Sequence, residues 1–180
     1  MAVERRRRGA ASARGQDDVK PSWAQALRLS SIPDQHYSLS AEKRQLLFWC
    51  AQSMPEGGSI VEIGVCRGGT AMMLAYVAKT LGGSYLGVDN WSLEGSYEDV
   101  RQVLDEEDLQ EPEVTLEFGD SRTIDLPDSP IDLLLIDGGH QDGVVDKDCA
   151  HWIPAVAPGG YVAFDDYTGR ALPREEDCHW

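Results

Sequence analysis

The chain has 180 residues, which suits one domain with a sizeable core, and its formal net charge is −15. This acidic balance disfavours nucleic acid as a partner, because phosphate binding needs a basic surface. No apolar run approaches the roughly 20 residues that span a bilayer, so no membrane partner is expected. The four cysteines are scattered without a C-x-x-C pair, which favours reduced thiols in a cytoplasmic protein over a disulfide framework or a zinc site.

The first 20 residues differ in composition from the rest. They contain six of the 16 basic residues but only three of the 31 acidic ones, and four consecutive arginines lie at positions 5–8. No apolar segment follows, which disfavours a secretory signal and leaves an organelle transit peptide as the alternative. We expect residues 1–20 to form a disordered basic tail and residues 21–58 to form N-terminal helices. Ser40 is a suitable N-cap for a helix over residues 41–54.

From residue 59 onward, short apolar segments alternate with segments of helical pattern. The expected strands cover residues 59–63, 84–88, 113–118, 131–136 and 160–164. The expected helices between them cover residues 69–81, 96–110 and 141–152. This alternation predicts an α/β fold with a doubly wound, mostly parallel, Rossmann-like sheet. We assign the core to residues 59–169 and a short polar C-terminal tail to residues 170–180.

The first of these strands contains an acid and leads into a glycine-rich turn before an apolar helix. The glycines of this turn are Gly64, Gly68 and Gly69. Glycines let the backbone approach a ligand closely at a helix N-terminus. Glu62 precedes the turn, and Asp89 ends the next strand, where a carboxylate suits a ribose diol. Cys66 stands where a dinucleotide fingerprint has its middle glycine, which disfavours the alternative of an NAD-dependent oxidoreductase.

Acidic side chains also follow the last two expected strands. Asp137 and His140 follow one of them, and Asp165 and Asp166 follow the other. Because the C-terminal ends of parallel strands share one edge, these side chains should converge there. Three carboxylates favour a hard, oxygen-liganded cation such as Mg²⁺, and histidine is the usual general base near neutral pH.

Each of these residues also has a structural interpretation. Asp137 could instead cap the helix expected over residues 141–152, and His140 could pack on the sheet at the start of that helix. Asp165 and Asp166 are neighbours that point to opposite sides in an extended segment, so both reach one ion only if the chain turns there. Asp148, within the same helix, is interpreted as part of a solvated face.

Taken in chain order, these motifs resemble those of class I S-adenosylmethionine-dependent methyltransferases. The resemblance covers roughly residues 40–169 and rests on EIGVCRGGT at 62–70, Asp89, GDS at 119–121, DGGH at 137–140 and PGGYVAFDD at 158–166. Within this class the chain is most similar to metal-dependent O-methyltransferases that act on antibiotic sugars, and to their small-molecule relatives.

The resemblance implies an S-adenosylmethionine site and a metal site. The cofactor-binding residues that it implies are Glu62, Gly64, Gly68, Gly69, Thr70, Asp89, Trp91, Asp120 and Ser121. The metal ligands that it implies for Mg²⁺ are Asp137, Asp165 and Asp166, with Asp137 and His140 as catalytic residues and His140 as the base.

Individual roles in the cofactor site also follow from the resemblance. Glu62 would face the methionine amino end, Asp89 would take the ribose hydroxyls, and Asp120 and Ser121 would lie near the adenine amino group. Asp120 or Ser121 could also cap a following helix. Trp91 either flanks the adenine or only packs.

The sequence therefore predicts an S-adenosylmethionine-dependent O-methyltransferase acting on a hydroxyl of a small molecule, a sugar or a secondary metabolite, assisted by a divalent ion. The resembled fold normally continues with a further helix and a C-terminal antiparallel hairpin, which we expect this chain to lack. The last strand should then have an open edge, to be covered in a homo-oligomer or by a longer partner chain. The alternative is a truncated nucleoside-binding or assembly protein without turnover.

Overall fold

The computed structural model of the chain describes residues 1–5, 20–32, 39–92, 95–139 and 143–165. The strands within these residues are β1 (Ala2–Arg5), β2 (Ser59–Ile63), β3 (Ser84–Asp89), β4 (Val114–Phe118), β5 (Ile131–Ile136) and β6 (Val156–Phe164). The helices are α1 (Trp23–Leu29), α2 (Ala41–Gln52), α3 (Gly69–Thr80), α4 (Tyr97–Glu106) and α5 (Val144–Trp152), followed by the 3₁₀ turn η2 (Ile153–Ala155). From residue 59 onward, every expected strand and helix is present, with boundaries that differ by a few residues.

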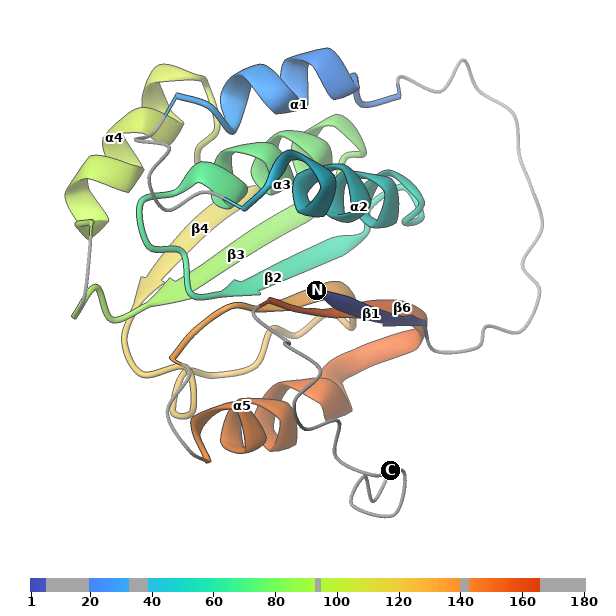
Figure 1. Cartoon of the computed structure of the whole chain (residues 1–180), viewed down its shortest axis with the longest axis vertical. Coiled ribbons are helices and arrows are strands. Elements are labelled where there is room, and N and C mark those ends of the chain that lie inside the picture. Colours follow the sequence, from blue (N-terminus) through green and yellow to red (C-terminus); the bar gives the residue numbers. More distant parts are fainter. Residues whose placement is uncertain (6–19, 33–38, 93–94, 140–142, 166–180) are drawn as a thin grey trace.

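The strands form one sheet in the order β1-β6-β5-β2-β3-β4. Pairing is parallel from β6 through β4, and β1 alone runs antiparallel. Figure 1 shows α1, α2 and α3 over one face of this sheet and α5 on the opposite face. This is the doubly wound, mostly parallel, Rossmann-like fold that the alternation of strands and helices predicted.

Alternate residues of the central strands supply two apolar cores, one on each face. Ile60 and Leu133 belong to the core beneath α1, α2 and α3, whereas Val61 and Leu134 belong to the core on the α5 side, with Trp152. Every residue of β2 and β5 is buried. Strands covered on both faces read as continuous apolar runs, and Glu62 interrupts such a run.

The N-terminal strand differs from the sequence-based expectation. β1 pairs with β6 from Ala2↔Phe164 to Arg5↔Tyr161, so residues 2–5 are not part of a disordered tail. This strand covers the edge of β6 that was expected to be open. Strands pair through backbone N–H and C=O groups, and every residue but proline carries both. A four-residue edge strand is therefore difficult to predict from the sequence. Residues 6–19 and 166–180 lie outside the described part of the chain, and so does the whole C-terminal tail expected over residues 170–180.

Serine caps position the helices that cover the upper face. Ser40 Oγ accepts a hydrogen bond from the backbone N–H of Lys43 at 3.3 Å, which confirms the predicted N-cap of α2. Trp23 of α1 and Phe48 of α2 pack with ring centroids 5.2 Å apart. In the described segments, no helix combines the length and apolarity needed to cross a membrane. Cys50, Cys66 and Cys149 form no disulfide.

Candidate active site

The glycine turn between β2 and α3 packs directly against the end of β5. Gly64 has φ +92°, and a Cβ on it would lie 2.3 Å from the carbonyl oxygen of Asp137. Gly68 has φ +85° and is the N-cap residue of α3. Both positions need glycine, since other residues disfavour positive φ and Gly64 has no room for a side chain. The start of the predicted turn therefore lies against the backbone of Asp137, the predicted acceptor-side acid.

The carboxylate of Asp89 holds this turn in place from the end of β3. Its Oδ2 accepts the backbone N–H of Cys66 at 2.7 Å, and its Oδ1 accepts the backbone N–H of Trp91 at 2.7 Å. The indole Nε1 of Trp91 donates to the carbonyl oxygen of Cys66 at 2.9 Å. Each carboxylate oxygen of Asp89 has a further lone pair, which could accept a ribose hydroxyl. Asp89 and Trp91 thus fasten the strand end to the turn.

Glu62 lies within the sheet beneath the turn and is only 1% exposed. The hydroxyl of Tyr85 donates to its Oε2 at 2.5 Å. Burial raises the pKa of Glu62 well above its ordinary value; the Tyr85 hydrogen bond opposes this shift, and the charges of Asp137 and Asp89 add to it. Gly87 lies opposite Glu62 in β3, and a Cβ there would lie 2.7 Å from the Tyr85 hydroxyl. Three carboxylates therefore influence one another at the ends of β2, β3 and β5.

An aromatic cluster lies beside Asp89, at the ends of β3 and β4. The ring of Trp91 is stacked with Phe118 at 5.9 Å between centroids and meets Tyr97 edge-on at 5.3 Å. Phe118 is 66% exposed. The three rings line a hollow of about 490 Å³, together with residues 95, 96 and 98. Neither Phe118 nor Tyr97 was identified from the sequence, although an aromatic residue at a parallel strand's C-terminal end was a usable signal.

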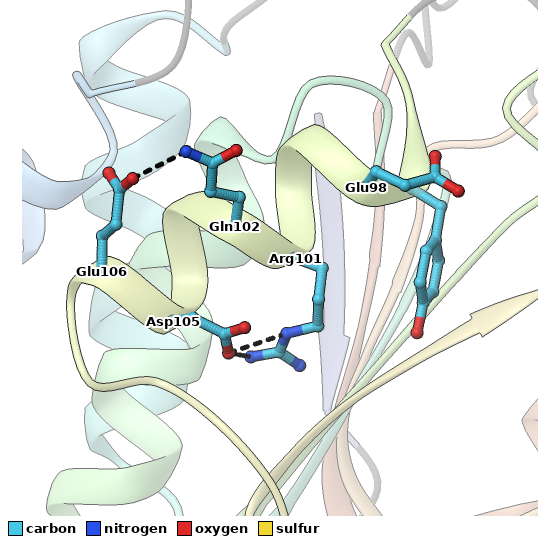
Figure 2. A pocket seen from close by; sticks show the side chains of 6 residues that line it. Glu98, Arg101, Gln102, Asp105 and Glu106 are labelled. Atoms are coloured by element: carbon cyan, nitrogen blue, oxygen red, sulfur yellow. Dashed lines mark hydrogen bonds and ion pairs between the residues drawn. The ribbon is translucent and has the colours of Figure 1, made fainter.

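A second hollow, of about 510 Å³, runs along α4 and is shown in Figure 2. Its polar side chains pair within the helix: Arg101 Nε donates to Asp105 at 3.0 Å, and Gln102 donates to Glu106 at 2.8 Å. Pairs four residues apart are typical of a solvated helix surface. This hollow is therefore not the candidate active site, which lies at the strand ends.

The segment after β4 contradicts the helix-cap interpretation of Asp120 and Ser121, and their place near the adenine stays a prediction. No helix begins at Asp120 or Ser121; residues 120–123 form a turn, so neither caps a following helix. Arg122 Nε donates to Asp120 at 2.6 Å, and this hydrogen bond lowers the pKa of Asp120 to about 2. Ser121 Oγ donates to Asp148 of α5 at 2.6 Å.

Asp148 corrects a second expectation. It is buried instead of lying on a solvated helix face, and burial raises the pKa of its carboxyl. The Ser121 hydroxyl satisfies the buried carboxylate, and Trp152 Nε1 donates to the Ser121 carbonyl at 2.9 Å. Ser121 thus ties the β4 end to α5.

On the acceptor side, Asp137 and Asp165 lie on neighbouring strand ends, as predicted. The backbone N–H of Asp137 donates to Ile63 O at 2.8 Å, and that of Asp165 donates to Ile136 O at 3.1 Å. Helix α5 begins at Val144 with Gly143 as its N-cap residue, so Asp137 does not cap it. His140 and Asp166 lie outside the described residues.

A lysine from the N-terminal helices pairs with one of the predicted metal ligands. Lys43 Nζ of α2 lies 2.6 Å from Asp165 Oδ1, and the side chain of Asp165 is only 6% exposed. Elsewhere in the described part of the chain, no three His, Cys, Asp or Glu side chains gather in a way that could hold a metal ion. Mg²⁺ binds through carboxylate oxygens and water, and Oδ1 of Asp165 is already paired with the Lys43 ammonium group. The described residues therefore do not fit the expected Mg²⁺ site.

Comparison with known proteins identifies the class of this fold. The sequence model of a family described as a methyltransferase domain matches residues 61–167, more than half of the chain. No curated protein matches the chain significantly.

Several solved methyltransferase structures are similar to the chain. A candidate caffeoyl-CoA O-methyltransferase from Staphylococcus aureus has a TM-score of 0.58 and 18% identity, over 81% of this chain and 66% of that protein. The O-methyltransferase NovP has a TM-score of 0.57 and 22% identity, over 70% and 65%. A Haemonchus contortus phosphoethanolamine N-methyltransferase, in complex with phosphoethanolamine and S-adenosylhomocysteine, has a TM-score of 0.54 and 18% identity, over 76% and 29%. The chain spans less than two thirds of the length of each protein.

The similarity to these solved structures shows a shared fold, and the match to the family model shows that the chain is a member of that family. The matched region contains the glycine turn and the Asp89 carboxylate that lies across it. The chain therefore belongs to the methyltransferase domain family and has the Rossmann-like fold of class I S-adenosylmethionine-dependent methyltransferases.

Proposed function

We propose that this protein binds S-adenosylmethionine and transfers its methyl group to a hydroxyl of a small molecule. The observation that carries this proposal is the pairing of Asp89 Oδ2 with the backbone N–H of Cys66 at 2.7 Å, across the glycine turn. It supports a nucleoside site, because an acid at the end of β3 and an open helix N-terminus lie side by side.

The charge of the strand ends suits a positively charged cofactor. Glu62, Asp89 and Asp137 are close enough that the charges of Asp89 and Asp137 raise the pKa of Glu62. A ligand with an ammonium and a sulfonium group would relieve this repulsion. When bound, S-adenosylmethionine supplies the methyl group, which an acceptor oxygen displaces from sulfur.

The protein's own contribution to transfer is alignment and proton removal. Asp89 and the glycine turn would fix the nucleoside, and the ends of β5 and β6 would place the acceptor hydroxyl. The hydroxyl proton must leave as the new oxygen–carbon bond forms, and His140 remains the predicted base. Assistance by Mg²⁺ also remains a prediction, against which the Lys43–Asp165 pair argues, so we assign no step to an ion.

Calorimetric titration with S-adenosylmethionine, S-adenosylhomocysteine and NAD⁺ tests the cofactor. We expect saturable binding of the first two and none of NAD⁺, and tight binding of NAD⁺ alone would contradict the proposal. Transfer of a labelled methyl group to a panel of phenols, catechols and sugars then tests turnover. Cofactor binding without transfer to any hydroxyl compound would favour the alternative of a nucleoside-binding or assembly protein.

A further inference from the structure

The ion pair between Lys43 and Asp165 joins two parts of the chain that are distant in sequence. Lys43 lies in the first turn of α2, where the Ser40 cap fixes its backbone. Asp165 directly follows β6. The Lys43 side chain is 31% exposed and the Asp165 side chain 6%, so the contact is largely withdrawn from water on the aspartate side.

This ammonium group contacts one of the three carboxylates that the sequence predicted would hold a cation. The backbone N–H of Asp165 bonds to the carbonyl of Ile136, the residue before Asp137. Lys43 thus brings a positive charge to the strand end next to the acid that contacts the glycine turn. A buried carboxylate needs a compensating partner, and the Lys43 ammonium group supplies the opposite charge.

Lysine and a divalent ion would compete for the same carboxylate. A hard cation binds through carboxylate oxygens, and at Oδ1 of Asp165 it would have to displace Nζ. The displaced ammonium group would then stay tethered near a doubly charged ion, and like charges at such distances repel strongly in a partly buried site.

We propose that the Lys43 ammonium group takes the place of a divalent metal ion at Asp165, so that the acceptor side carries its cation within the chain. The pair excludes a divalent ion as long as Lys43 is present. Any role of this ammonium group toward an acceptor hydroxyl rests on the proposed function. The exclusion of a metal ion from Asp165 does not depend on that function. Lys43 is in this sense a positioning residue that neutralises Asp165.

Mn²⁺ titration followed by electron paramagnetic resonance tests this proposal without cofactor or acceptor. We expect no saturable Mn²⁺ binding by the unmodified chain and saturable binding by Lys43→Met, with a dissociation constant at least about tenfold below the highest Mn²⁺ concentration at which the unmodified chain shows none, because removal of one partner leaves a buried charge uncompensated. Lys43→Arg should stay free of Mn²⁺, and Asp165→Asn added to Lys43→Met should abolish the new site.

Lys79→Met is the matched control. Lys79 pairs with Asp108 at 3.2 Å, but the side chain of Asp108 is 84% exposed, so this substitution should create no Mn²⁺ site. Should Lys43→Met fail to fold, as judged by thermal melting, Lys43→Gln carries the same measurement. Saturable Mn²⁺ binding by the unmodified chain, no gain on loss of Lys43, or an equal gain in Lys79→Met would each overturn the proposal. Titration with S-adenosylmethionine is separate, and its failure would affect only the proposed function.

Discussion

The two sides of the candidate site are built in different ways. On the cofactor side, backbone groups of the glycine turn are held by Asp89, and the contact between Gly64 and Asp137 leaves no space for a side chain. On the acceptor side, a lysine from a separate helical layer reaches a strand-end carboxylate. The first arrangement depends on local chain geometry, and the second depends on how α2 packs over the sheet.

This difference determines how each side should respond to change. A turn fastened by backbone hydrogen bonds and close packing tolerates few substitutions, because any new atom meets backbone that cannot move. An ion pair between layers can be rebuilt with another cation, since charge is required there more than shape. Substitutions on the cofactor side should therefore affect stability and cofactor affinity together, and those on the acceptor side should change ion preference.

Gly64→Ala should have the largest effect. The new Cβ would lie 2.3 Å from Asp137 O at a residue with φ +92°, so we expect a loss of about 2–5 kcal/mol in unfolding free energy. Gly82→Ala is the control, since Gly82 has φ +66° and open space, and it should lose only about 1–2 kcal/mol. Urea unfolding of both variants measures the difference, and equal losses would show that close packing at Gly64 adds nothing to the strain of positive φ.

Asp89→Ala should weaken S-adenosylmethionine binding at least about tenfold, since hydrogen bonds to a charged group contribute roughly 1.5–3 kcal/mol each. The substitution also removes the acceptor for the backbone N–H groups of Cys66 and Trp91. Asp89→Asn keeps one carbonyl acceptor and should retain part of the affinity. Calorimetric titration compares the three proteins, and an unchanged dissociation constant in Asp89→Ala would remove Asp89 from the cofactor site.

The cofactor side was largely predictable from the sequence because its signals are local. Gly64 and Gly68 form the predicted turn, where both have positive φ, and Asp89 lies across the turn from them. The partner of Glu62 was less visible. A glutamate in an apolar strand demands a donor, and Tyr85 could have been chosen only with the register of β2 and β3 in hand.

On the acceptor side, the sequence predicted which carboxylates follow neighbouring strands, but it did not predict that Lys43 would be the cation beside one of them. That Asp137 and Asp165 lie on adjacent strands follows from parallel topology alone. The approach of Lys43 depends on where α2 crosses the sheet, and no sequence pattern encodes it. Asp148 was misinterpreted for a similar reason: its burial depends on the Ser121 hydroxyl from the segment after β4.

Tyr85→Phe should have an intermediate effect and a characteristic pH dependence. It removes the donor to buried Glu62, which should cost about 1–3 kcal/mol of stability. A carboxyl with a raised pKa in the folded state contributes stability at low pH, and this contribution is lost as pH rises through the folded-state pKa. Since the Tyr85 hydrogen bond lowers the pKa of Glu62, its removal should raise that pKa further.

The pH series of urea unfolding should therefore separate the two proteins. The stability lost by Tyr85→Phe, relative to the unmodified chain, should grow once pH rises above the raised folded-state pKa of Glu62, because from there only the variant continues to lose stability with pH. Tyr76→Phe is a suitable control, because the Tyr76 hydroxyl accepts a hydrogen bond from the exposed backbone N–H of Ser22. A constant difference across the series would mean that Glu62 does not change its protonation with the loss of its partner.

Phe118→Ala should have the smallest effect on stability and still report on the cofactor side. Phe118 is 66% exposed, so its truncation should cost less than about 0.5 kcal/mol of unfolding free energy. Its ring stacks with Trp91 at the end of β3, and if an adenine ring lies against this cluster, its loss should weaken S-adenosylmethionine binding by about two- to tenfold. Leu126→Ala, a truncation of another exposed apolar side chain, should leave the affinity for S-adenosylmethionine unchanged.

If all three proteins bind S-adenosylmethionine equally well, the aromatic cluster has only a packing role. The adenine would then lie elsewhere along the edge formed by β3 and β4. If Phe118→Ala alone binds S-adenosylmethionine more weakly, the cofactor side includes β4, the outermost parallel strand, as well as the glycine turn.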